Sequence, residues 1–323
     1  TPAQAIEKYN RDYLRHFLVR ESRGEDFRFE WEALEDVHRF YNTLANTHLF
    51  TRTYLNVYNA STKAPSTGLQ PEDKWITSRL YETIDTCTQA YNAFTPYKAL
   101  QCLDEFVVED LSRTYVKLVR ERVQGKTRKA LEQTLNHCML SILRLLAPVA
   151  PHYAEAVYQD MRTPKLPESV HLLSLATPDR KRVDKKLNGE MQTVKEIAQA
   201  CLALREEQKL RLRWPLEELV LEAGKRPVKT LEGVLARLCN VKKITHATAK
   251  PSGTGTYASR KLKDLTVYVN TNASQELKDE WEYMELRRRV QELRKQKNLQ
   301  PAQVVTLRVQ CNDPAFLSRF KKQ

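Results

Sequence analysis

The chain has 323 residues, a formal net charge of +13 and a hydrophobic fraction of 41%. That length leaves room for about two domains, each with a core of its own. No stretch approaches the run of about 20 apolar residues that a membrane-spanning helix needs. The composition therefore favours a globular, basic protein and argues against a membrane-spanning one.

The start of the chain and its cysteines indicate where the protein works. The first residue is Thr1, and the residues after it lack the basic-then-apolar order of a signal peptide. The six cysteines are dispersed and form no closely spaced pair of the kind that binds zinc. We expect a piece of a longer cytoplasmic protein, with reduced thiols and no metal site.

Positive charge is distributed unevenly along the chain. Residues 1–180 contain 23 basic and 23 acidic residues, whereas residues 181–323 contain 30 and 17. Such an asymmetry is typical of proteins that meet nucleic acid or another anionic surface.

Apolar residues at helical spacing predict a mainly helical first part. We expect helices over 3–20, 31–58 and 74–94, the last capped by Asp73. The same spacing predicts a helical hairpin whose two arms meet at a break over Gln124–Lys126, and Pro151 suits the first turn of a further helix. The sequence therefore predicts a leading helix within 1–26 and an up-and-down bundle over 27–161, with residues 59–73 as a loop.

Residues 162–186 are rich in prolines and predict an extended linker to a second domain, 187–323. Strands alternate there with helices, which is typical of a small α/β or α+β domain. We expect helices over 187–209, 231–238 and 275–297, strands near 216–221, 242–247, 265–269 and 304–309, and a loop over 250–259.

The turn of the predicted hairpin is the most basic feature of the bundle. Part of this charge complements the helix dipole, and charge runs are commonly solvated faces. Arg113 also has a possible partner in Glu109, four residues before it. Together, however, seven cations against the single Glu121 point to a polyanion. They are Arg113, Lys117, Arg120, Arg122, Lys126, Arg128 and Lys129.

Two later elements are also basic. Arg211 and Arg213 alternate with leucines, which would place the charges on one side of an extended segment. Trp214 beside them would either anchor the next strand or stack on a base. The helix over 275–297 carries four arginines.

The sequence contains no nucleotide-binding, hydrolase or metalloprotease motif of the common kinds, and its histidines are scattered. We therefore expect binding rather than catalysis, with no catalytic residue in this chain.

Several runs of sequence resemble one family. The pattern DxWIxSRL from Asp73, the run FVVEDLSRTYVKLVRERV and the run LLAPVAPHYAEAVYQ are similar to the anticodon-binding region of class I aminoacyl-tRNA synthetases for isoleucine, valine, leucine and methionine. LRLRWPLEELVLE and RRRVQELRKQKNL resemble the C-terminal region of isoleucyl-tRNA synthetases of the archaeal-like type. EKYNRDYLRHFLV resembles the helix that follows the catalytic domain in that family.

The resemblance implies a tRNA-binding portion of an ATP-dependent ligase. Neither the HIGH nor the KMSKS signature is present, so the resemblance implies that this portion is inactive alone. ATP and magnesium, and the catalytic and editing domains, would belong to the parent chain. The implied partner is an isoleucine tRNA. Bacterial members often bind zinc near the C-terminus, which these cysteines do not suggest.

From the charges and the resemblance together we expect nine residues to contact tRNA. They are Arg113, Lys117, Arg120, Arg122, Lys126, Arg128, Arg211, Arg213 and Trp214. Two other hypotheses stay open, namely valine or leucine specificity and a helical scaffold that binds a protein through its basic surface.

Overall fold

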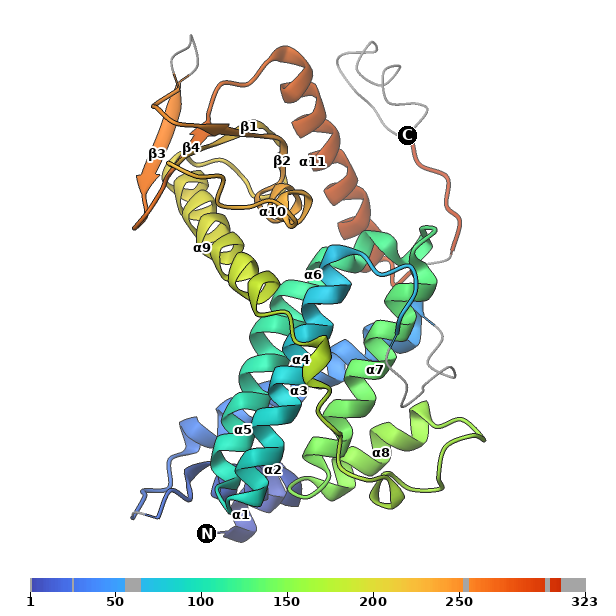
Figure 1. Cartoon of the computed structure of the whole chain (residues 1–323). Helices are drawn as coiled ribbons and strands as arrows, with labels where there is room; N and C mark the ends of the chain where they lie inside the picture. Colours follow the sequence, from blue (N-terminus) through green and yellow to red (C-terminus); the bar gives the residue numbers. More distant parts are fainter. Residues whose placement is uncertain (1, 25, 56–64, 252–255, 300–302, 309–323) are drawn as a thin grey trace. The chain divides into compact units, whose positions relative to one another are not determined.

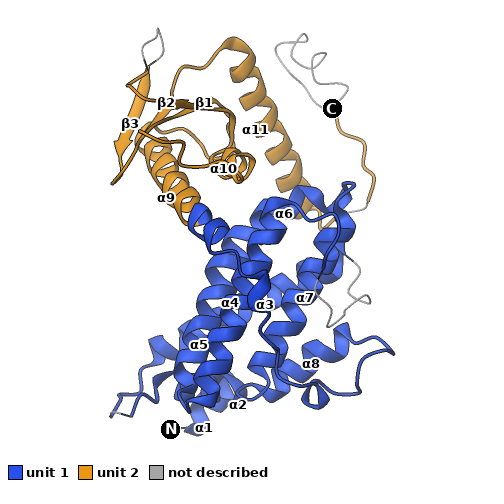
Figure 2. Ribbon diagram, in the orientation of Figure 1, with its two compact units in different colours: residues 1–191 blue, residues 192–323 orange. Residues whose placement is uncertain are grey.

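The computed structural model describes residues 2–24, 26–55, 65–251, 256–299 and 303–308. The chain divides into two compact units, residues 1–191 and 192–323 (Figure 2). The division falls within helix α9 (Lys185–Glu207). The chain is mainly helical with one small sheet, which confirms the predicted fold class.

The first unit is a bundle of helices (Figure 1). The helix expected over 3–20 is divided in two at Asn10, whose side-chain oxygen accepts the backbone N–H of Tyr13 at 2.9 Å and so caps a new helix. The helices of this unit are α1 (Pro2–Lys8), α2 (Arg11–Glu21), α3 (Trp31–Tyr54), α4 (Pro71–Asn92), α5 (Pro96–Glu105), α7 (Arg128–Leu146) and α8 (Pro151–Met161).

Helix α4 begins earlier than the sequence suggests. Pro71 occupies its first turn and Gln70 is the N-cap. The prediction that Asp73 caps this helix was therefore wrong. Asp73 lies in the first turn, where its Oδ2 accepts the backbone N–H of Gln70 at 2.9 Å as half of a capping box.

The first arm of the predicted hairpin is continuous but not uniformly α-helical. After α5 it becomes a π-helix, η2 (Phe106–Val116), then the short α6 (Lys117–Val119) and the 3₁₀ helix η3 (Arg120–Gln124). The break before α7 and the start of α8 at Pro151 are confirmed. An apolar stripe is buried along the whole arm, at Leu100, Leu103, Val107, Leu111, Tyr115 and Leu118.

Residues 162–186 are fastened to the bundle. The guanidinium of Arg180 bonds the carboxylate of Asp85 at 3.0 Å, and the backbone N–H of Asp184 donates to the Ser78 hydroxyl at 2.8 Å. This segment lies within the first unit and contains the short helices η4 (Val170–Leu172) and η5 (Arg180–Arg182).

The second unit contains a four-stranded sheet in the order β2-β1-β4-β3. The β1–β2 pair is parallel, joined through a helix, and the other two pairs are antiparallel. The elements are β1 (Leu216–Glu222), α10 (Glu232–Cys239), β2 (Val241–Ala247), β3 (Tyr257–Lys261), β4 (Thr266–Asn270) and α11 (Gln275–Gln296).

Two predictions for the second unit were wrong. Residues 257–259 belong to β3 rather than to a loop, because they pair with β4. Residues 304–308 form no strand, and Val304 is 95% exposed. Residue 309, the end of that expected strand, lies outside the described residues.

Candidate nucleic-acid interface

The end of the hairpin, residues 117–129, carries the exposed cations and is called the bundle tip below. Leu118, Val119 and Val123 point into the core and hold η3 against the bundle, which turns the basic side chains outward. The exposed cations are Lys117, Arg120, Lys126, Arg128 and Lys129. None of these five has an ion pair within the described part of the chain.

A pocket of about 540 Å³ lies at the bundle tip. Phe50 and Tyr54, one turn apart on α3, line it with their rings 5.4 Å apart between centroids, and Tyr54 is 44% exposed. Arg120 lines it from η3. Aromatic faces beside a guanidinium suit an unstacked nucleobase, which stacks and accepts hydrogen bonds. The other lining residues are Glu121, Val123 and Gln124.

Phe50 and Tyr54 are not among the nine residues expected to contact tRNA. Leu49, the apolar residue beside Phe50, is 57% exposed, so apolar residues near the end of α3 do not mark its inward face. The available signal was the spacing of two aromatic residues at i and i+4, off the buried stripe.

Arg122 occupies a different environment from Arg120. Its side chain is 11% exposed, and its two terminal nitrogens donate to the two carboxylate oxygens of Asp73 at 2.8 and 2.7 Å. Its Nη1 also donates to Glu72 at 3.1 Å. These bonds occupy the guanidinium inside the bundle. The expected phosphate contact at Arg122 does not fit this arrangement, and we leave Arg122 out of the interface.

The carboxylate of Asp73 has a second buried partner. The hydroxyl of Tyr115 donates to its Oδ1 at 2.6 Å. Burial, followed by the nearby charge of Asp73, raises the pKa of Tyr115 well above its ordinary value. Tyr115 therefore stays a hydrogen-bond donor, and the cluster of Asp73, Tyr115 and Arg122 ties α4 to the hairpin.

Arg113 takes the alternative that the sequence offered. Its Nη1 donates to Glu109 at 2.5 Å, four residues earlier, and both side chains are exposed. Lys117, Arg120, Lys126 and Arg128 are the expected contacts that the structure leaves exposed on the bundle tip.

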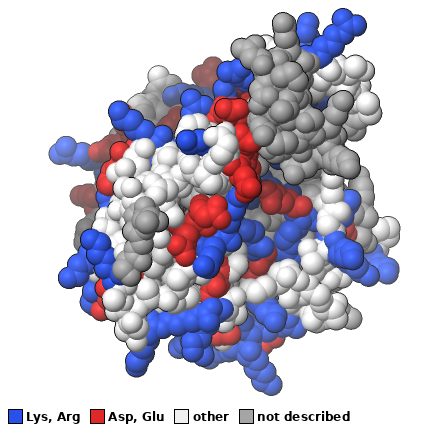
Figure 3. Space-filling model, turned by 90° about the horizontal axis from the view of Figure 1, so that it is seen from above, with Lys and Arg blue, Asp and Glu red and all other residues white. Residues whose placement is uncertain are grey.

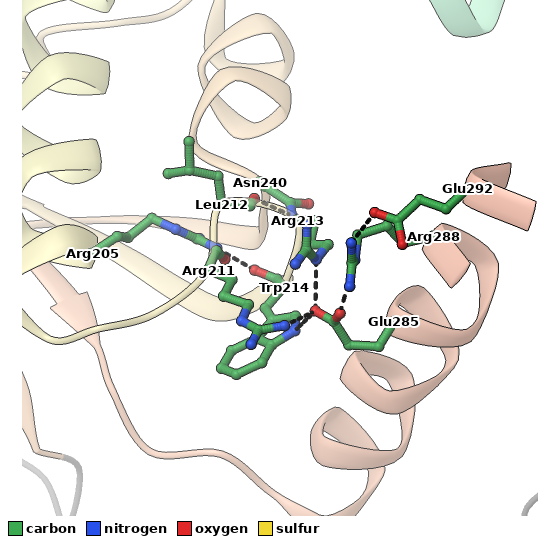
Figure 4. Close-up of polar contacts among 9 residues, drawn as sticks. All are labelled: Arg205, Arg211, Leu212, Arg213, Trp214, Asn240, Glu285, Arg288 and Glu292. Atoms are coloured by element: carbon green, nitrogen blue, oxygen red, sulfur yellow. Dashed lines mark hydrogen bonds and ion pairs between the residues drawn. The ribbon is translucent and has the colours of Figure 1, made fainter. Parts of the chain in front are cut away.

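In the second unit, the segment before β1 is a turn, so the prediction of an extended segment was wrong. The backbone N–H of Trp214 donates to the carbonyl of Arg211 at 3.0 Å. Lys209 has a φ of 56°, in the left-handed region. The turn nevertheless brings two cations together, since Arg211 and Arg213 bond Glu285 of α11 at 2.8 and 2.6 Å (Figure 4).

Trp214 is held by the same carboxylate. Its Nε1 donates to Glu285 at 3.0 Å, and its ring stacks on Trp281 with 4.6 Å between centroids. Bonds from Arg213 first, and then from Arg211, Arg288 and Trp214, lower the pKa of Glu285 to about 2. These contacts hold the turn before β1 against α11, whereas the sequence suggested that Trp214 either anchors the next strand or stacks on a base.

On the face shown in Figure 3, Lys and Arg side chains are mixed with Asp and Glu. Among the described residues no three His, Cys, Asp or Glu side chains come together as a metal site. No helix in the described ranges is both long and apolar enough to span a membrane.

Residues 73–221 match the family described as the anticodon-binding domain of tRNA ligase. The chain is 35% identical over 255 residues to the isoleucine–tRNA ligase of Methanopyrus kandleri, a match that covers 75% of this chain and 24% of the relative. It is 32% identical over 265 residues to that of Methanothermobacter thermautotrophicus, with 77% and 25% covered. The chain thus spans about a quarter of the length of these curated relatives.

A solved complex of a leucyl-tRNA synthetase from Agrobacterium radiobacter K84 is similar at a TM-score of 0.40 and 17% identity. That match covers 57% of this chain and 21% of the solved one. A score at this level does not bear on the site.

Proposed function

We propose that the chain binds the anticodon arm of an isoleucine tRNA, because residues 73–221 match the anticodon-binding domain of tRNA ligases. In this proposal it is the tRNA-binding portion of an isoleucine–tRNA ligase. Aminoacylation, with its ATP and magnesium, then belongs to the longer enzyme and its catalytic and editing domains. The chain contributes by positioning the tRNA.

The observation that carries the proposal is that exposed cations and an aromatic pocket lie together at the bundle tip. Lys117, Lys126 and Arg128 are exposed, and we expect them to contact phosphates, which fix the register of an RNA without reading its sequence. Tyr54 and Arg120 line a volume in which a base that has left the stack of a loop can be held. Phosphate contacts and base contacts would thus lie side by side.

Isoleucine is the amino acid named for both relatives described above. It is a finer statement than the family match, and it rests on identity over about three quarters of this chain. Comparing isoleucine, valine and leucine tRNAs in one binding assay tests it directly.

The test is fluorescence anisotropy with labelled tRNA transcripts across a salt series. Combined alanine substitution of Lys117, Arg120 and Lys126 should weaken binding to every tRNA and reduce the salt slope by about 0.7–0.9 for each phosphate that the variant no longer neutralises. Tyr54→Ala should instead cost about 1–3 kcal/mol with the slope unchanged. The matched control is Lys165→Ala, an exposed lysine beyond α8.

Unchanged affinity and slope in the triple variant would remove the bundle tip from the interface. Tight binding of a protein partner that is insensitive to salt, with no tRNA binding, would favour the scaffold hypothesis instead.

A further inference from the structure

Three arginines of the second unit converge on one carboxylate. Glu285 accepts from Arg211 at 2.8 Å, from Arg213 at 2.6 Å and from Arg288 at 3.3 Å (Figure 4). Two of these arginines come from the turn before β1 and the third from α11. The carboxylate therefore occupies a position in which guanidinium groups from two elements bind an anion.

The cluster has cationic donors to spare. Glu285 is 19% exposed, whereas the side chains of Arg211, Arg213 and Arg288 are 53%, 39% and 38% exposed. Glu292 takes a second bond from Arg288, so three positive charges face two negative ones. Each guanidinium has five N–H donors, and the described contacts with carboxylates use one or two of them. The remaining donors lie at an accessible surface.

The turn that presents two of these arginines is held from beneath. Arg205, fully buried, donates to the backbone carbonyls of Arg211 at 2.6 Å and Cys239 at 3.1 Å, and to that of Trp214 (Figure 4). The Arg211 guanidinium also lies 5.3 Å from the centre of the Trp214 ring. A backbone fixed in this way lowers the entropy that the arginines lose on binding a ligand.

We propose that Arg211, Arg213 and Arg288 form a second site for an RNA phosphate. When RNA is absent, the Glu285 carboxylate occupies the position of that phosphate. The proposal rests on the proposed function, that the chain binds RNA. Guanidinium groups recognise carboxylates and phosphates with the same fork of donors. A phosphate that enters the cluster exchanges one anion for another, while Glu285 competes with it.

The proposal fixes the sign of one substitution. Glu285→Gln removes the competing charge and leaves the arginines in place, so RNA should bind more tightly. One added phosphate contact steepens the salt slope by about 0.7–0.9. Over the tenfold change from about 1 M to 0.1 M salt, a slope of this size raises the affinity by about 5- to 8-fold. If Glu285 only clamps the turn to α11, the same change weakens binding or leaves it unaltered.

The experiment measures the fluorescence anisotropy of a labelled isoleucine tRNA transcript with the full chain. The KCl concentration is varied from about 50 to 200 mM, a range over which such slopes can be measured. Glu282→Gln is the matched control, since it removes the same charge from an exposed position of α11 that has no ion pair among the described residues. Tryptophan fluorescence checks that the Trp214–Trp281 stack is retained.

The outcomes separate the two proposals. Tighter binding and a steeper slope for Glu285→Gln than for Glu282→Gln support the site, and equal or weaker binding overturns it. If the bundle-tip variant loses affinity while Glu285→Gln changes nothing, only this inference fails. If the wild-type chain does not bind tRNA, the proposed function fails. A poly-glutamate peptide is tested in the same assay as a carboxylate ligand. If Glu285→Gln binds this peptide more tightly but not the tRNA, the phosphate site is also overturned.

Discussion

Arg120 and Arg122 are two residues apart, and the structure predicts opposite consequences for their removal. Arg122→Ala should destabilise the first unit severely, whereas Arg120→Ala should leave its stability nearly unchanged and weaken tRNA binding. The difference arises because Arg120 is exposed, while Arg122 neutralises carboxylates inside the bundle.

The magnitude follows from what Arg122 leaves behind. Asp73 is fully buried and Glu72 is 1% exposed, so both carboxylates would lose the guanidinium that compensates their charge. Removing one partner of a buried ion pair costs about 3–5 kcal/mol. At about 2–4 °C per kcal/mol for a unit of this size, the Tm should fall by about 6–20 °C. Arg120→Ala should stay within about 0.5 kcal/mol.

The assay is thermal unfolding followed by circular dichroism, on the full chain. A second variant tests the cause, because Asp73→Asn in the Arg122→Ala background removes a buried charge and should recover part of the loss. A Tm for Arg122→Ala within about 2 °C of that for Arg120→Ala would refute the reasoning, since it would mean that water reaches the carboxylates.

Two further predictions concern the second unit. The pKa of Glu285, about 2, lies below its ordinary value of 4.5. The contribution of Glu285 to stability should therefore be complete above pH 4.5 and be lost as the pH falls toward 2. Trp214 fluorescence should report this loss, and the Glu285→Gln variant should not show it. Arg205→Lys should destabilise the unit by about 1–3 kcal/mol in urea, because an ammonium cannot replace a planar fork that spans three carbonyls; an unchanged midpoint would contradict this.

Periodicity predicted most of the helices because burial repeats along one face. The stripe from Leu100 to Leu118 is buried even though part of it is a π-helix, since apolar spacing reports which side faces the core rather than which hydrogen bonds form. The break at Gly125 was visible because residues around it interrupt that spacing.

Long-range partners were invisible to the same reasoning. Arg122 looks like Arg120 in sequence because Asp73, its partner, is 49 residues away. The alternation around Arg211 suggested an extended segment, yet Arg205 and a left-handed Lys209 fold it into a turn. A local sequence pattern does not predict whether a residue is exposed when a side chain far away in the sequence binds that residue.

The difference between exposed arginines and arginines bonded within the chain changes the expected salt dependence of tRNA binding. Counted from sequence, the bundle tip and Arg113 offer seven cations, which would correspond to a slope of about 5–6 if all met phosphates. Arg113 is paired with Glu109 and Arg122 with Asp73, which leaves five exposed cations that have no ion pair among the described residues. Their share of the slope should then be at most about 3.5–4.5, measured as the difference between the chain and a variant with all five changed to alanine. A further loss of about 0.7–0.9 in slope when Arg113 is also changed to alanine would mean that RNA displaces Glu109 from it.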